Sequence, residues 1–105
     1  MPESDDKYIS NSQQRILTIM MHLGGHETHG LAPGEISKSL NISPANVTHD
    51  LANLKYRGLA DRIPNTNRWR LLPSLVQLST AMLHNVGRKR AELDEIVQRY
   101  TRTPY

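Results

Sequence analysis

The sequence contains no cysteine and no long apolar run, and it has none of the residue patterns that mark common enzyme sites. Without cysteine, disulfides and thiolate metal sites are excluded. Without a long apolar run, we expect neither a membrane span nor a secretory signal, and therefore a cytoplasmic protein. A phosphate-binding loop, a nucleophile elbow and a pair of carboxylates in a plausible cleft are all missing, so we expect no enzyme. The 105 residues have room for one domain with a modest core.

Three of the five histidines lie close together in the sequence. His22, His26 and His29 are spaced by four and three residues. A continuous helix would bring their imidazoles together, but Gly24-Gly25 interrupts the helical pattern between them. The spacing also differs from that of the zinc-protease helix motif. We therefore expect a loop here, and neither a metal nor any other cofactor.

Charge is unevenly distributed along the chain. Met1 to Leu54 carries three basic and six acidic side chains and sums to −3, whereas Lys55 to Tyr105 carries ten basic and four acidic ones and sums to +6. Such asymmetry suggests a polyanionic partner, although a solvated basic surface is the alternative.

The first part of the chain predicts a tail followed by a helix. Residues 1–9 are polar and acidic and predict a disordered tail. Ser10 and Gln13 match a capping box, which predicts a helix start, and Gly24-Gly25 predicts its end. Helical spacing of apolar residues supports this element, in Ile16, Leu17, Met20 and Leu23.

Two further helices with a tight turn between them are predicted next. Leu31-Ala32 suits a short extended segment, and Pro33 suits the first turn of a helix. Asn41 tolerates the left-handed conformation of a helix stop. Ser43-Pro44 then provides an N-cap and a first-turn proline, and Gly58 closes this third helix. Its apolar stripe is Val47, Leu51 and Leu54, and its other faces carry Ala45, Asn46, Thr48, His49, Asp50 and Asn53.

A basic hairpin is predicted after this helix. Residues 59–63 and 68–72 suit two strands, and the turn between them is Pro64-Asn65-Thr66-Asn67. Alternation places Trp69 on an inner face with Leu59, Ile63 and Leu71. The same alternation places Arg62, Arg68 and Arg70 on the opposite face.

The chain after Pro73 predicts a helical extension. Its apolar residues recur at distances that are sums of three and four along much of the segment: Leu75, Leu78, Met82, Val86, Leu93, Ile96, Val97 and Tyr100. This spacing suits a helix pair or short coiled coil, and we expect it to form a homodimer. The alternative is a helix folded back on its own core. Gly87 leaves open whether the segment is one helix or two.

Together these elements predict a mainly α fold with a small β-hairpin: a winged helix-turn-helix at 10–72 with a C-terminal helical extension at 73–105. In this fold the helix at about 43–57 enters the major groove of double-stranded DNA, and the wing at 62–70 lies on the backbone or minor groove. Asparagine can bind adenine bidentately, and arginine can bind phosphates. The expected DNA-contacting residues are Ser43, Pro44, Ala45, Asn46, Thr48, His49, Asn53, Arg62, Asn65, Asn67, Arg68 and Arg70.

The run from Leu31 to Pro44, with Val47, Leu51, Leu54 and Gly58-Leu59, resembles winged-helix transcriptional repressors of bacterial and archaeal type. Residues 58–62 are similar to the start of the hairpin in the MarR group. Residues 69–75 are similar to the N-terminal DNA-binding domain of the IclR group. The resemblance implies a DNA-binding transcriptional regulator that acts as a dimer, and we expect it to be associated with the nucleoid in the cytoplasm. The chain departs from the IclR pattern at Ala45, Asn46 and His49, and it lacks that group's large effector domain, so we expect no small-molecule effector.

Two alternatives to a sequence-specific regulator remain. Winged helices also act as protein-interaction modules, and some DNA-binding proteins are sequence-tolerant and architectural. For a regulator, a two-fold dimer would direct its recognition helices to half-sites about one DNA turn apart.

Overall fold

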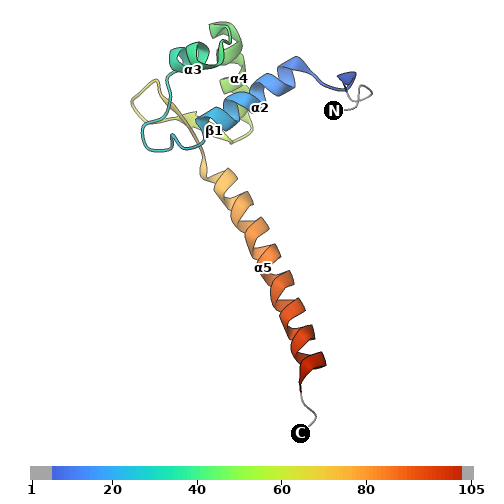
Figure 1. The fold of residues 1–105 in the computed structure, drawn as a ribbon. Helices are drawn as coiled ribbons and strands as arrows, with labels where there is room; N and C mark the ends of the chain where they lie inside the picture. Colours follow the sequence, from blue (N-terminus) through green and yellow to red (C-terminus); the bar gives the residue numbers. More distant parts are fainter. Residues whose placement is uncertain (1–5, 103–105) are drawn as a thin grey trace. The chain divides into compact units, whose positions relative to one another are not determined.

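The computed structural model describes residues 6–102, and these divide into two compact units between Pro73 and Ser74. The first unit contains α2 (Asn11–Leu23), α3 (Pro33–Leu40), α4 (Pro44–Tyr56), β1 (Ala60–Arg62) and β2 (Trp69–Leu71), and α5 (Pro73–Thr101) forms the second (Figure 1). Of the tail predicted at 1–9, residues 1–5 lie outside the described part of the chain. Residues 6–9 include a turn in which the Ile9 amide donates to the Asp6 carbonyl at 3.2 Å.

The predicted boundaries of α2 are confirmed. The Ser10 hydroxyl accepts a hydrogen bond from the Gln13 amide at 3.3 Å, which is one half of the predicted capping box. Gly24 ends the helix, and Gly25 follows with a φ of 88°. Because the chain turns here, His22 and His26 do not continue along one helix face. Within residues 6–102, no three His, Asp or Glu side chains lie close enough together to hold a metal ion.

The turn between α3 and α4 forms through the residues that predicted it. Pro33 occupies the first turn of α3, and Asn41 ends that helix with a φ of 54°. Ser43 caps α4 through its hydroxyl, which accepts a hydrogen bond from the backbone N–H of Asn46 at 3.2 Å. Gly58 follows α4 with a φ of 77°, a conformation that glycine adopts without a Cβ penalty.

The core of the first unit is shared by all its elements. Helices α2, α3 and α4 pack their apolar faces together, and the hairpin closes one side. Leu31 pairs with Trp69 through two backbone hydrogen bonds of 2.9 and 2.8 Å, so the predicted extended segment adds a short third edge to the hairpin. The buried apolar residues are Ile19, Leu23, Leu31, Ile36, Val47, Leu51, Leu54, Ala60 and Trp69.

The hairpin register overturns one prediction. Ala60 pairs with Leu71, Asp61 with Arg70, and Arg62 with Trp69. Directly opposed residues of antiparallel strands lie on the same face of the sheet. Arg62 therefore shares the face of Trp69, and the prediction that it lies with Arg70 on the opposite face is wrong. Simple alternation failed because the register across the hairpin, which the sequence did not reveal, decides which residues are opposed.

The strands are shorter than predicted because the hairpin turn begins early. Ile63 still donates its amide to the Arg68 carbonyl at 2.7 Å, but Pro64 has no amide to donate. Asn65 then turns the chain with a φ of 64°. The regular pairing is thus limited to three residues on each strand.

The second unit is one continuous helix. Helix α5 runs through Gly87 without a break, which answers the question that the sequence left open. None of its described residues is buried. No helix within residues 6–102 is long and apolar enough to cross a membrane.

Candidate nucleic-acid interface

Helix α4 presents two exposed stripes of residues at helical spacing. Asn46, His49 and Asn53 form one stripe, and all are exposed. Ala45, Thr48, Ala52 and Lys55 form the neighbouring stripe, which is also exposed. The side-chain amide of Asn53 donates to the His49 backbone carbonyl at 2.8 Å, and the Thr48 hydroxyl donates to the Pro44 carbonyl at 3.0 Å. Ser43 and Pro44, at the start of the helix, are exposed as well.

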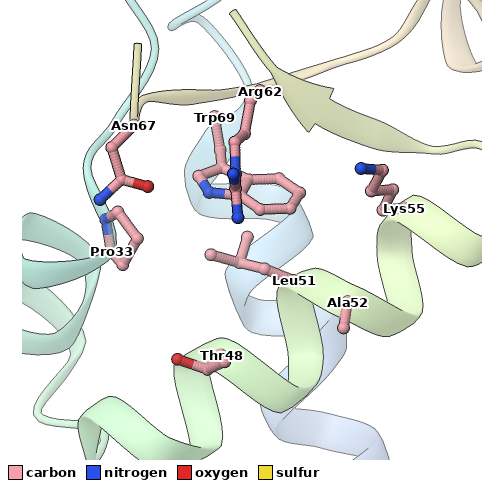
Figure 2. A pocket seen from close by; sticks show the side chains of 8 residues that line it. All are labelled: Pro33, Thr48, Leu51, Ala52, Lys55, Arg62, Asn67 and Trp69. Carbon is pink, nitrogen blue, oxygen red and sulfur yellow. The ribbon is translucent and has the colours of Figure 1, made fainter.

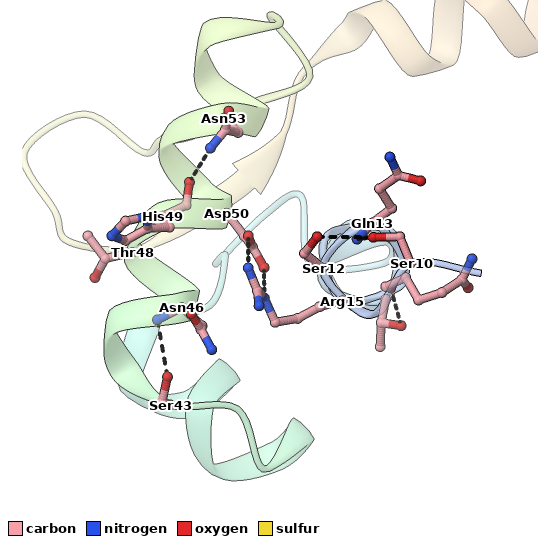
Figure 3. Close-up of polar contacts among 12 residues, drawn as sticks. Ser10, Ser12, Gln13, Arg15, Ser43, Asn46, Thr48, His49, Asp50 and Asn53 are labelled. Carbon is pink, nitrogen blue, oxygen red and sulfur yellow. Dashed lines mark hydrogen bonds and ion pairs between the residues drawn. The ribbon is translucent and has the colours of Figure 1, made fainter. Parts of the chain in front are cut away.

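Asp50 does not belong to these exposed stripes, contrary to expectation. It is only 4% exposed, and its carboxylate binds the guanidinium of Arg15 on α2 through two bonds of 2.6 and 2.9 Å (Figure 3). These bonds raise the pKa of Arg15 above its usual range. Asp50 lies at helical spacing from the buried residues Val47, Leu51 and Leu54. This spacing was the signal in the sequence from which its burial could have been predicted. The ion pair fixes α4 against α2.

A groove separates α4 from the hairpin (Figure 2). Its volume is about 470 Å³. Apolar residues form much of its surface: Pro33, Leu51, Ala52 and Trp69. Polar and basic residues complete the lining: Thr48 and Lys55 from α4, and Arg62 and Asn67 from the hairpin. Three of the predicted contact residues, Thr48, Arg62 and Asn67, are thus brought to one place.

The two cations of the groove are held differently. The Arg62 guanidinium lies over the Trp69 ring, 5.5 Å from its centroid, and the side chain is exposed. Stacking on a ring face leaves the N–H edges of a guanidinium free to donate. The Lys55 ammonium lies 3.7 Å from the Asp61 carboxylate, in an exposed pair that contributes little stability. Both cations are available to an anionic ligand.

Arg68 is engaged within the protein. Its guanidinium donates to the carbonyls of His29 and Gly30 at 2.8 and 3.1 Å, and its third nitrogen pairs with Glu35 at 2.7 Å. The same Glu35 oxygen accepts from the Ala32 amide at 3.0 Å. The hydrogen bond from Ala32, and to a lesser degree the contact with Arg68, stabilise the charged form of Glu35. They lower the pKa of Glu35 below its usual range. Arg68 therefore ties the hairpin to the start of α3.

The remaining hairpin residues lie away from the groove lining. Arg70 is half-buried and pairs across the strands with Asp61, on the face opposite to that of Arg62 and Trp69. Asn65 is exposed in the turn. The structure thus separates the three wing arginines, which the sequence had grouped together, into three different environments.

Five of the eight residues that line the groove were not among the predicted contacts: Pro33, Leu51, Ala52, Lys55 and Trp69. Lys55 and Ala52 continue the stripe of Thr48 at helical spacing, so their alignment was visible in the sequence. The sequence did not show that the hairpin would face this stripe, because that depends on the direction in which the chain runs from Gly58 into β1.

Helix α5 carries an exposed apolar face. Of the predicted association residues, Leu75 is half-buried and the other seven are exposed. Val76 and Leu83 are also exposed, at 64% and 70%, and widen the face beyond the predicted residues. A face of this kind on a surface helix usually marks an interaction site.

No protein-family model and no curated protein matches the chain. A solved structure of an S. aureus MepR mutant, bound to an oligodeoxyribonucleotide, is similar to it with a TM-score of 0.52 and 22% sequence identity. The match covers 87% of this chain and 67% of that one. A mutant of ZitR from Lactococcus lactis matches with a TM-score of 0.45 and 20% identity, over 89% of this chain and 63% of that one. The chain has the winged-helix fold predicted from its sequence.

Proposed function

We propose that this protein binds double-stranded DNA, with α4 in the major groove and the hairpin across the adjoining backbone. The observation that carries the proposal is the groove between α4 and the hairpin, where Thr48, Lys55, Arg62 and Asn67 converge. A helix that fills a major groove places one phosphate backbone beside it. A groove lined by two cations and by the amide of Asn67 suits such a backbone.

The composition of α4 suits close approach to DNA. Its groove-facing stripe contains Ala45 and Ala52, whose small side chains leave room for the duplex. Its outer stripe offers Asn46, His49 and Asn53 to base edges, and asparagine can bind adenine bidentately. No arginine lies on these stripes, so affinity depends strongly on the cations beside the groove.

The fold supports the same proposal. The MepR mutant that shares it was solved with an oligodeoxyribonucleotide. MepR is a regulator of the MarR group, so the likeness favours that group over the IclR group as the closer relative. By this analogy we propose a transcriptional regulator that reads a preferred sequence.

We further propose that the protein acts as a homodimer through α5. A helix of 29 residues with no buried side chain has no apolar partner within its own unit. Association of two copies would cover the exposed apolar face and double the number of DNA contacts. The exposed face extends from Leu78 to Tyr100, and we expect the residues that meet the second copy to lie within it.

The proposal can be tested with a matched pair of asparagine variants. Asn46→Ala removes a base-reading candidate from α4, whereas Asn11→Ala removes an exposed asparagine from the start of α2. After selection of bound duplexes from a random pool, Asn46→Ala should weaken binding to the selected sequence by about 1–3 kcal/mol. Asn11→Ala should not. Equal loss on all duplexes would indicate sequence-tolerant binding, and no binding by the unaltered chain would reject the DNA proposal.

A further inference from the structure

We propose that α5 pairs antiparallel with α5 of a second copy, with Leu93 of each copy seated in a hollow of the other. The inference deepens the proposed homodimer and rests on it, because it specifies how the two copies meet. It depends on the described residues of α5 alone.

The exposed face of α5 contains a two-stranded coiled-coil seam. Steps of four and three residues connect Leu75, Ser79, Met82, Val86, Lys89, Leu93, Ile96 and Tyr100. This is the repeat by which two helices wind around each other. Six of the eight positions are apolar, and Ser79 and Lys89 are the exceptions. The seam therefore fits a second helix, and Lys89 restricts the ways in which that helix can lie.

A shallow hollow of about 400 Å³, open to solvent, lies in the middle of this seam. It is lined by Asn85, Val86, Lys89, Arg90 and Leu93. Four of these residues, Val86, Lys89, Arg90 and Leu93, have the i, i+3, i+4, i+7 spacing of a hole that receives one side chain from a partner helix. The walls are apolar and the rim carries two cations. The best occupant is therefore an apolar side chain with a carboxylate next to it.

Leu93 with its neighbour Glu92 has this chemistry. Leu93 is 62% exposed, so it is free to enter a hollow on another helix. In an antiparallel pair, Leu93 of one copy lies opposite the hollow of the other, and Glu92 lies beside Lys89 and Arg90. In a parallel pair, the side chain opposite the hollow is Lys89, which would meet the two cations of the rim.

The charges along α5 favour the same orientation. Arg88, Lys89 and Arg90 form a basic run, and Glu92, Asp94 and Glu95 follow as an acidic group. Parallel pairing in register would place basic run on basic run and acidic group on acidic group. Antiparallel pairing places each basic run against the acidic group of the other copy, and these opposite charges attract each other.

Seam and charges together select one register. An antiparallel pair centred on residue 91 aligns Met82 with Tyr100, Val86 with Ile96, and Lys89 with Leu93. The aliphatic stem of Lys89 then covers the partner's Leu93, while its ammonium, which lies 3.4 Å from Glu92 of its own chain, also approaches the partner's Glu92. Leu78 falls outside the overlap, because its counterpart position would be residue 104.

This arrangement affects how DNA is bound. At a rise of about 1.5 Å per residue, the two Pro73 residues lie about 54 Å apart along the pair. The winged-helix units are then attached at opposite ends of the coil, whatever the orientation of each unit on its helix. Half-sites one DNA turn apart are thus not set by α5 itself, and two well-separated DNA segments become the favoured target.

Pairs of spin labels on the full-length chain test the orientation. The sequence has no cysteine, so Gln77→Cys, His84→Cys and Ala91→Cys each give one label per chain, at equivalent positions on the outer side of the seam. The expected axial separations between the two copies are about 42, 21 and 0 Å. The measured distances should therefore shorten in that order. Equal distances at all three positions would show parallel pairing, and absence of any distance would show no pairing; either result overturns the proposal.

Two leucine variants test the hollow and the register. Leu93→Ala and Leu78→Ala remove the same group from sites that are 62% and 59% exposed. By sedimentation, Leu93→Ala should weaken self-association roughly ten- to hundred-fold, whereas Leu78→Ala should leave it almost unchanged. Equal effects, or a larger effect of Leu78→Ala, would overturn the proposed register. DNA is absent from these experiments, so their failure would leave the proposed DNA binding to be judged by its own test.

Discussion

Replacing Gly30 by alanine should loosen the hairpin from the helices. Gly30 has a φ of 66°, and a Cβ added there would lie 2.6 Å from the Trp69 carbonyl oxygen. That oxygen cannot simply move away, because it accepts the Leu31 amide at 2.9 Å. The carbonyl of Gly30 itself accepts a further hydrogen bond, from the Arg68 guanidinium. The substitution therefore strains the contact that joins the hairpin to the preceding loop.

The size of the effect can be worked out from two contributions. The left-handed conformation costs a non-glycine residue about 1–2 kcal/mol. Displacing the Trp69 strand weakens the two hydrogen bonds with Leu31, at about 1 kcal/mol each. Gly30→Ala should thus lower the free energy of unfolding by about 3 kcal/mol, which for a unit of this size lowers Tm by roughly 12–24 °C.

Gly25→Ala is the matched control. Gly25 has a φ of 88°, but nothing lies within 4 Å of an added Cβ. This variant should show the conformational cost alone, about 1–2 kcal/mol. Urea denaturation followed by circular dichroism and by fluorescence of Trp69, the one tryptophan in the sequence, measures both variants. If Gly30→Ala is no less stable than Gly25→Ala, the close packing of Gly30 against the Trp69 strand is not what holds the hairpin.

Two further predictions concern ionic contacts. Asp50→Leu alone should destabilise the protein more than the double variant Arg15→Met with Asp50→Leu, because the single variant leaves the Arg15 cation without its partner. Denaturation midpoints compare the stability of the two variants. A double variant less stable than the single one would contradict this prediction. Glu35 has a lowered pKa, so its stabilising effect is present above the ordinary glutamate range and is lost as pH falls through the lower folded-state pKa. Acid titration of Trp69 fluorescence should therefore show a smaller pH-dependent loss of stability in Glu35→Gln, and an unchanged acid profile would contradict the assignment.

Much of the fold was predictable because local signals and packing agree. Ser43-Pro44 predicted the start of α4, and Asn41 and Gly58 predicted the helix ends. Each of these residues acts through its own backbone geometry or a bond to a near neighbour, so a single sequence reveals it. The exposed positions of Asn46 and His49 followed from the same periodicity.

What could not be predicted depends on contacts between distant residues. Arg62 lies on Trp69 because of the strand register, and Arg68 is held by Glu35, which lies 33 positions earlier in the chain. Asp50 is buried because Arg15 of α2 reaches it. Charge alone made the arginines look equivalent, whereas tertiary contacts assign one to the groove and another to the protein's own framework.

The salt dependence of duplex binding tests the central claim most directly. The affinity of the full-length chain should fall linearly on a log–log plot against salt concentration, with a slope of about −0.9 for each phosphate contacted by a cation. Arg62→Ala should make this slope shallower by about 0.9, because it removes one cation from the groove. Binding that does not respond to salt, or a slope that Arg62→Ala leaves unchanged, would contradict the placement of a DNA backbone between α4 and the hairpin.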